Sequence, residues 1–311
     1  MSRVALLFPG QGSQYVGMGR DLAEDDSSIR ELYERADDAL GMPLSRLCWE
    51  GPEDQLRATE NAQPAIMLHS CAVWRLIAGR AGRVEVGAGH SLGELSAYLV
   101  SGAFGFEDGL RIVRRRGELM GASGAARPGT MAAVLGLDAE AVTQICERAG
   151  GEGRVVVPAN LNAPGQVVIS GDVEAVAAAG DLATEAGARR VLPLNVSGAF
   201  HSPLMAAAAE GLEVALEAAS WAEPSFPVVS NATAASVTDA GTARRTLIMQ
   251  LTSPVRWAEG IERIRETGVS RWLEVGPGNV LSGLARRVDR SLRVAPVGDS
   301  RSVDAYLGSA D

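Results

Sequence analysis

The stretch that decides the fold is residues 84–100, VEVGAGHSLGELSAYLV. It begins with an apolar run of the length of a buried strand and, from Leu95, continues with helical periodicity. Ser91 stands between the two parts, with Gly89 and Gly93 two residues to either side. Because glycine has no Cβ atom, the pattern predicts a strand, a sharp turn and a helix. Such a turn exposes the serine hydroxyl and leaves the next N–H free at a helix N-terminus, as a nucleophilic serine requires.

Strands and helices alternate on both sides of this turn. We predict strands over residues 4–8, 227–230 and 272–275, and helices over residues 26–40, 63–78, 107–120, 257–267 and 280–288. This alternation predicts an α/β fold of the α/β-hydrolase-like type, in which a mostly parallel sheet has helices on both faces.

The middle of the chain follows a different order. We predict strands over residues 130–137, 154–158, 166–170 and 189–194, and helices over residues 138–149 and 173–186. The order βαββαβ is typical of a ferredoxin-like subdomain. We therefore expect a large α/β catalytic domain of residues 1–127 and 196–311, interrupted by a small subdomain of residues 128–195.

The composition excludes some partners and favours one compartment. The net charge of −9 argues against nucleic acid or an anionic membrane as a partner, although all 29 basic residues are arginine. The N-terminal apolar run is too short for a signal peptide, and no apolar stretch reaches about 18 residues. The three cysteines show no CxxC spacing, which indicates neither a disulfide framework nor a metal site. We expect a cytoplasmic protein.

A serine nucleophile needs a base, and the chain has three histidines. His90 precedes Ser91, and adjacent side chains around so sharp a turn point apart. His69 lies inside an apolar helical stretch and favours a place in the core. His201 lies in a loop between a strand and a helix, where α/β folds place functional side chains. The sequence leaves two roles open for His201: the base, or a loop histidine satisfied by local hydrogen bonds.

Arg116 is predicted to face the core. The apolar residues three or four positions from it are Ile112, Val113, Leu119 and Met120. Side chains at those spacings share one helix face, whereas Arg114 is placed beside Glu118 and Arg115 on the side of Arg111. A buried guanidinium needs an anion. That anion is either a structural Asp or Glu or the carboxylate of a substrate, held by a bidentate clamp.

Gln11 follows the first predicted strand, between Gly10 and Gly12. The two glycines would let a backbone N–H approach a ligand closely, although a plain tight turn fits the same residues. The pattern lacks the Gly-Lys-Ser/Thr ending of a phosphate-binding loop.

Five motifs together resemble one family. They are Phe8–Gln14, Gly89–Glu94, Arg116–Met120, Gly198–Met205 and Glu274–Gly278. They occur in the order and spacing of the malonyl-CoA:acyl-carrier-protein transacylases, the family that includes the acyltransferase domains of polyketide and fatty acid synthases. The resemblance covers nearly the whole chain, including the ferredoxin-like segment.

The resemblance implies transfer of a malonyl group from malonyl-CoA to the phosphopantetheine thiol of an acyl carrier protein. Ser91 would carry the malonyl group, His201 would move the proton, and the backbone N–H groups of Gln11 and Leu92 would hold the oxyanion. The family uses no cofactor beyond its substrates, and we expect a monomer.

The resemblance also assigns roles in recognition. Arg116 matches the arginine that holds the malonyl carboxylate, and Gln250 matches the position that orients the histidine. Gln63, Met120 and Phe200 match the pocket, where the bulk of Phe200 favours malonyl over branched acyl units.

The sequence fits several other functions less well or leaves them open. An esterase of the α/β-hydrolase type requires the order Ser, Asp/Glu, His with a late histidine, but 110 residues follow His201. An editing hydrolase of the same family would act on neutral acyl chains and leave Arg116 without a carboxylate. A non-catalytic carrier-binding protein need not keep both Ser91 and His201. A trans-acting polyketide synthase acyltransferase for another acyl unit stays open.

Overall fold

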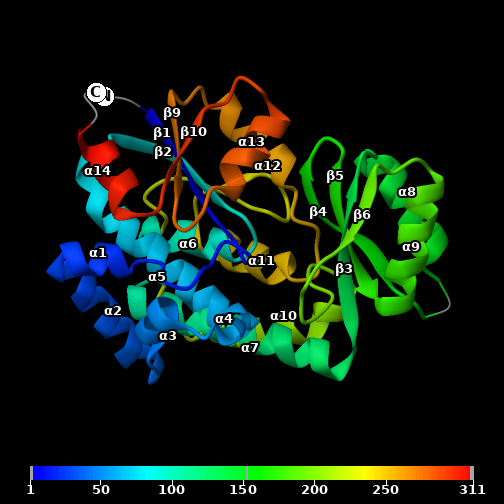
Figure 1. Ribbon diagram of the computed structural model, residues 1–311, viewed down its shortest axis with the longest axis horizontal. Coiled ribbons are helices and arrows are strands. Elements are labelled where there is room, and N and C mark those ends of the chain that lie inside the picture. Colours follow the sequence, from blue (N-terminus) through cyan, green and yellow to red (C-terminus); the bar gives the residue numbers. More distant parts are fainter. Residues whose placement is uncertain (1–2, 152, 309–311) are drawn as a thin grey trace.

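The computed structural model describes residues 3–151 and 153–308 and contains two sheets (Figure 1). The larger sheet has six strands in the order β10-β9-β1-β2-β7-β8, and only the pair β7 and β8 is antiparallel. These strands are β1 (Arg3–Phe8), β2 (Arg83–Gly89), β7 (Val228–Val229), β8 (Ser236–Val237), β9 (Arg271–Val275) and β10 (Val294–Val297). The mostly parallel sheet confirms the predicted α/β class.

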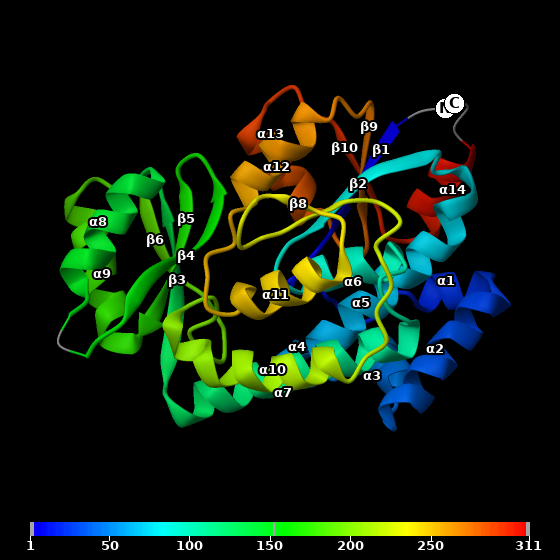
Figure 2. The ribbon, with the colours of Figure 1, turned by 180° about the vertical axis from the view of Figure 1, so that it is seen from behind.

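Helices cover both faces of the larger sheet, as Figures 1 and 2 show. On β1, Leu6 and its alternate neighbours pack in the core with α5 and α6, whereas Leu7 packs in a separate core with α12 and α13. This two-sided burial explains why residues 4–8 form an uninterrupted apolar run. The helices around this sheet are α1 (Arg20–Asp25), α2 (Ser27–Leu40), α3 (Leu44–Glu50), α4 (Glu53–Arg57), α5 (Thr59–Ile77), α6 (Leu92–Val100), α7 (Phe106–Ala126), α10 (Ala206–Glu217), α11 (Ala240–Gln250), α12 (Trp257–Glu266), α13 (Val280–Val288) and α14 (Ser300–Gly308). Two short 3₁₀ turns are η1 (Ala78–Arg80) and η2 (Pro203–Met205).

The smaller sheet has the order β4-β5-β3-β6 and is antiparallel throughout. Its elements are β3 (Gly129–Leu135), α8 (Ala139–Ala149), β4 (Val156–Ala163), β5 (Gln166–Asp172), α9 (Val173–Glu185) and β6 (Arg190–Pro193). Helices α8 and α9 pack on the face of this sheet that lies away from the larger sheet in both views (Figures 1 and 2). The connections are those of the predicted ferredoxin-like unit. The domain boundaries at residues 127/128 and 195/196 stay a prediction.

Strand β4 differs most from its prediction. The sequence predicts a strand over residues 154–158 and a turn over residues 160–165, where asparagine, proline and glycine are typical turn formers. Instead the strand runs to Ala163, with its register against β5 shifting after Pro158. Beyond that shift the strand also pairs with the larger body, because Leu161 N–H donates to the Val255 carbonyl and Val255 N–H to the Ala159 carbonyl, both at 2.8 Å.

The structure contains helices and strands that the sequence does not predict. They are the short helices between residues 20 and 57, helices α11 and α14, and strands β8 and β10. Helix α7 extends six residues beyond Met120, to Ala126. Asp138 is the N-cap of α8, since its side chain accepts a hydrogen bond from Ala141 N–H at 2.8 Å. A membrane-spanning segment is not found among the helices of residues 3–151 and 153–308.

Candidate active site

The turn at Ser91 has the sharp geometry that the sequence predicts. Ser91 connects β2 to α6 with φ 52° and ψ −110°, a conformation that residues with side chains rarely adopt. A Cβ atom on Gly89 would lie 1.9 Å from the carbonyl of Gly93, and one on Gly93 would lie 2.1 Å from the Phe8 carbonyl oxygen. Both glycines are therefore required by close backbone packing around the serine.

His201 reaches the serine from the loop before η2. Its Nε2 lies 2.8 Å from Ser91 Oγ, and its Nδ1 lies 2.8 Å from the main-chain carbonyl oxygen of Gln250. A carbonyl oxygen only accepts, so Nδ1 carries the proton and Nε2 is free to accept from the hydroxyl. The backbone of His201 also has a positive φ, 57°, which turns the ring toward the serine. Of the two roles left open by the sequence, the geometry favours the base.

Burial keeps this histidine neutral. His201 is 3% exposed, and burial, together with the nearby positive charge of Arg116, lowers its pKa to about 3. A neutral imidazole is the form that can remove a proton from Ser91.

Arg116 projects inward from α7 and is 1% exposed. Its Nη2 donates to Ser91 Oγ and to Gln250 Oε1, both at 3.0 Å, and its Nη1 donates to Gln63 Oε1 at 2.7 Å. Burial lowers the pKa of Arg116 to about 10, opposed by the charge of Glu94. Within residues 3–151 and 153–308 no carboxylate forms an ion pair with this guanidinium. The structural ion pair, one of the two alternatives from the sequence, is therefore not found there.

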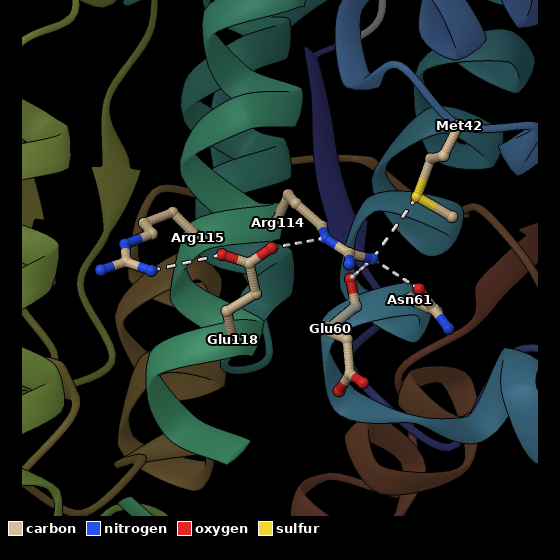
Figure 3. Close-up of polar contacts among 6 residues, drawn as sticks. All are labelled: Met42, Glu60, Asn61, Arg114, Arg115 and Glu118. Atoms are coloured by element: carbon tan, nitrogen blue, oxygen red, sulfur yellow. Dashed lines mark hydrogen bonds and ion pairs between the residues drawn. The ribbon is translucent and has the colours of Figure 1, made fainter. Parts of the chain in front are cut away.

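The neighbouring arginines of α7 behave differently (Figure 3). Arg114 Nε donates to Glu118 at 2.9 Å, as predicted, and Arg114 also reaches Asn61. Arg115, predicted on the side of Arg111, lies 3.3 Å from the other oxygen of Glu118. The carboxylate three residues ahead attracts Arg115, whereas Arg111 would repel it. Glu118 thus pairs with Arg114 and Arg115. Arg116 instead donates to buried side-chain amides.

The loop after β1 packs directly on the serine turn. A Cβ atom on Gly10 would lie 2.4 Å from the carbonyl oxygen of His90, so Gln11 follows a point of backbone contact. The Gln11 side chain turns aside, because its Nε2 donates to Thr59 Oγ1 at 3.1 Å. Within the described chain no acceptor lies at the backbone N–H of Gln11 or at that of Leu92, the first residue of α6. Two donors are therefore available beside Ser91.

Three residues matched to a pocket by resemblance surround Arg116 and His201. Gln63 is fully buried in α5 and lies with its Nε2 3.5 Å from Met120 Sδ, while its oxygen holds Arg116. Phe200 directly precedes His201 and is 6% exposed. The structure thus brings all three close to the reacting groups, and their part in substrate selection stays a prediction.

The other two histidines lie outside the reacting pair. His69 is fully buried and its Nε2 donates to the Gly298 carbonyl at 2.7 Å, which confirms a place in the core. His90 points away from Ser91, packs against the Trp257 ring, and donates from Nε2 to Asn162 Oδ1 at 2.8 Å. Asn162 lies on the part of β4 that the sequence analysis assigned to a turn.

Two further residues of the site were not identified from the sequence. Glu94 is fully buried on α6, and burial raises its pKa to about 7. The sequence feature that could have identified Glu94 is the presence of a carboxylate within the mostly apolar stretch of residues 92–100. Asn231 is 4% exposed and its Oδ1 accepts the Ser91 N–H at 2.7 Å. Nothing local to Asn231 indicates that contact, because the two residues are 140 positions apart.

Residues 5–305 match the family described as the acyl transferase domain. A malonyl CoA-acyl carrier protein transacylase of Bacillus subtilis is 45% identical over 99% of this chain and 97% of its own length. The chain belongs to the malonyl CoA-acyl carrier protein transacylase family. The Escherichia coli member is 40% identical over 99% of both chains.

Solved structures of this transacylase family have the same fold. An acyl carrier protein S-malonyltransferase of Vibrio cholerae superposes with a TM-score of 0.94 at 42% identity, covering 98% of this chain and 99% of its own. A malonyl-transacylase in complex with the acyl-carrier protein of a type II polyketide synthase superposes with a TM-score of 0.93, also at 42% identity and with the same coverage. The resemblance drawn from five sequence motifs is confirmed over the full length.

Proposed function

We propose that this protein transfers a malonyl group from malonyl-CoA to the phosphopantetheine thiol of an acyl carrier protein, through a malonyl ester of Ser91. One observation carries the proposal. Ser91 Oγ lies between a neutral base, His201 Nε2 at 2.8 Å, and a buried guanidinium, Arg116 Nη2 at 3.0 Å. The first contact supports acyl transfer, and the second supports an acyl group that ends in a carboxylate.

In the loading step His201 takes the hydroxyl proton while Ser91 Oγ attacks the thioester carbonyl carbon. The oxyanion of the tetrahedral intermediate is placed against the N–H groups of Leu92 and Gln11, at the positive end of α6. When the carbon–sulfur bond breaks, His201 returns the proton to the sulfur and CoA leaves as a thiol. The Gln250 carbonyl holds the imidazole in one tautomer throughout.

In the transfer step the same groups act in reverse. His201 takes the proton of the carrier thiol, the sulfur attacks the malonyl ester, and Ser91 Oγ leaves with the proton. Since both thiols use one site in turn, the kinetics are ping-pong. The proposed steps use this chain's residues and the two substrates, with no further cofactor.

Arg116 is proposed to select the malonyl group. Its charge is buried among amide oxygens and a hydroxyl, so an incoming carboxylate would supply the missing negative charge. The malonyl carboxylate is separated by one carbon from the carbonyl that Ser91 attacks, which suits a guanidinium in contact with Ser91 Oγ. Gln63 and Met120 would flank this carboxylate, and Phe200 would limit space for a branched α-carbon.

We also propose that the protein is a monomer and that it is located in the cytoplasm. A monomer suffices, because every group named in the mechanism comes from one chain. A cytoplasmic location is supported by three free cysteines, of which Cys48 and Cys146 are buried.

The direct test offers malonyl-, methylmalonyl- and acetyl-CoA to the enzyme and weighs the intact protein. We expect the mass of one malonyl group on wild type and no gain on Ser91→Ala. Holo-carrier proteins of fatty acid and polyketide synthesis are then added, and loss of the malonyl mass with gain on the carrier identifies the acceptor class. Malonyl release to water at the same rate without a carrier would indicate the editing hydrolase instead.

A further inference from the structure

The backbone at Ser91 is strained, so neighbouring groups must hold it in place. Ser91 precedes the first turn of α6, so its N–H has no acceptor within that helix. A serine with φ 52° and ψ −110° persists only where the surroundings fix it. The group that accepts from this N–H therefore helps to fix the turn.

That partner is the side-chain amide of Asn231, which spans the turn. Its Oδ1 accepts from Ser91 N–H at 2.7 Å, and its Nδ2 donates to the Gly89 carbonyl at 2.7 Å. One planar group thus joins the last residue of β2 to the serine. Only an amide of this length supplies an acceptor and a donor at these two places, because an aspartate would set an oxygen against the Gly89 carbonyl.

Glu94 in turn holds Asn231. Its Oε2 accepts from the backbone N–H of Asn231 at 3.0 Å and from Gln250 Nε2 at 2.6 Å. Gln250 is the residue whose carbonyl orients His201 and whose Oε1 accepts from Arg116. The buried Oε2 atom of Glu94 therefore contacts Asn231, which holds Ser91, and Gln250, which contacts both His201 and Arg116.

We propose that Asn231, held by Glu94, is a positioning residue that fixes the strained conformation of Ser91 and so the direction of its hydroxyl. The inference rests on the proposed function, because it takes Ser91 as the nucleophile. It assigns no proton transfer to Asn231 or Glu94. Both act through the residues that they hold.

The test measures the reactivity of Ser91 toward an alkyl fluorophosphonate. Ser91 Oγ forms a bond to phosphorus, fluoride leaves, and the hydroxyl proton passes through His201 to solvent. This probe has no carboxylate and needs neither Arg116 nor a carrier protein. Asn231→Ala leaves the Ser91 N–H and the Gly89 carbonyl without partners, so we expect labelling and the kcat of malonyl loading to fall about tenfold to hundredfold. The KM for malonyl-CoA should change much less.

Thr233→Ala is the matched control. Thr233 lies on the same loop, and its hydroxyl accepts only from the nearby Ala235 N–H. It should keep both rates. Asn231→Asp keeps the acceptor for Ser91 N–H and nearly the same volume, so it reports on the turn if the alanine variant folds poorly. We expect its labelling to be slowed as well.

Variants of Glu94 show whether its hydrogen-bond acceptor or its negative charge is needed to hold Asn231. Its second oxygen, Oε1, makes no hydrogen bond within the described chain. Glu94→Gln can therefore keep one oxygen toward both donors, and we expect it to retain most of the labelling rate. Glu94→Ala should slow labelling as Asn231→Ala does.

The outcomes distinguish the two proposals. Wild-type enzyme that neither loads malonyl nor reacts with the probe at Ser91 refutes the proposed function, and this inference with it. Wild-type enzyme that does both, alongside a folded Asn231→Ala or Asn231→Asp variant with unchanged rates, overturns this inference alone. A lowered melting temperature with normal labelling would show that Asn231 stabilises the fold without positioning the serine.

Discussion

Replacing Arg116 by alanine removes the positive charge that is proposed to pair with the malonyl carboxylate. The change also frees Gln63 and Gln250 from the guanidinium that they hold, so the absolute rate of loading will report rearrangement as well as recognition. The ratio of kcat/KM for malonyl-CoA to that for acetyl-CoA is the cleaner measure. Any general displacement of Ser91 lowers both values, whereas only the malonyl group loses an ion pair.

The magnitude follows from the burial of Arg116. Leaving one member of a buried charge pair without its partner costs about 3–5 kcal/mol. Arg116 is 1% exposed, but the pocket must open to admit CoA, so we take the lower end, about 3 kcal/mol. Since about 1.4 kcal/mol is a factor of ten, the malonyl-to-acetyl ratio should fall on the order of 100-fold.

The assay follows acyl-enzyme formation by intact mass against time at several concentrations of each CoA ester. Arg115→Ala is the matched control, because Arg115 lies one residue away with its side chain 55% exposed and pairs with Glu118 at the surface. We expect its ratio to equal that of wild type. A ratio for Arg116→Ala within about threefold of wild type would refute the proposed clamp.

Three further predictions concern pH and packing. The kcat/KM for malonyl loading should stay constant as the pH falls from 8 to 5, because the pKa of His201 is lowered to about 3 and the base stays neutral. A loss of kcat/KM on acidification, with a midpoint near pH 6.5, would contradict this. Burial raises the pKa of Glu94 from 4.5 to about 7, so its contribution to stability is lost as pH rises through that interval. In urea unfolding, wild type should therefore weaken relative to Glu94→Gln between pH 5 and 8, and parallel profiles would argue against a buried ionising carboxyl. Gly93→Ala should unfold at markedly lower urea or fail to fold, since its Cβ would meet the Phe8 carbonyl. Gly121→Ala, whose Cβ would lie 3.8 Å from the Glu60 side chain, should be at least as stable as wild type, and equal stability of the two variants would rule out the close approach at Gly93.

Features encoded by short-range patterns were predictable from the sequence. The turn at Ser91 depends on two glycines within four residues, and the inward direction of Arg116 depends on helical periodicity within one helix. The ferredoxin-like order emerged for the same reason, because each strand and helix has its own local signature. The resemblance to a known family then placed His201 and Gln250.

Contacts between distant parts of the chain were not predictable in this way. Asn231 meets Ser91 across 140 residues, and Asn162 meets His90 across 72. The sequence predicts too short a strand β4 because residues 160–165 favour a turn, whereas pairing with Val255 on the larger body overrides that preference. Polar residues in loops and at strand ends carry no periodicity that would indicate their partners.

The main-chain carbonyl behind His201 has a consequence for the fate of the acyl-enzyme. Burial and the charge of Arg116 make the imidazole a weak base, and the neutral Gln250 carbonyl offsets them less than a carboxylate in its place would. A thiol, with a pKa of about 8.5, gives up its proton to a weak base far more readily than water, with a pKa of about 16. The ester of Ser91 would therefore react more readily with an arriving thiol than with water.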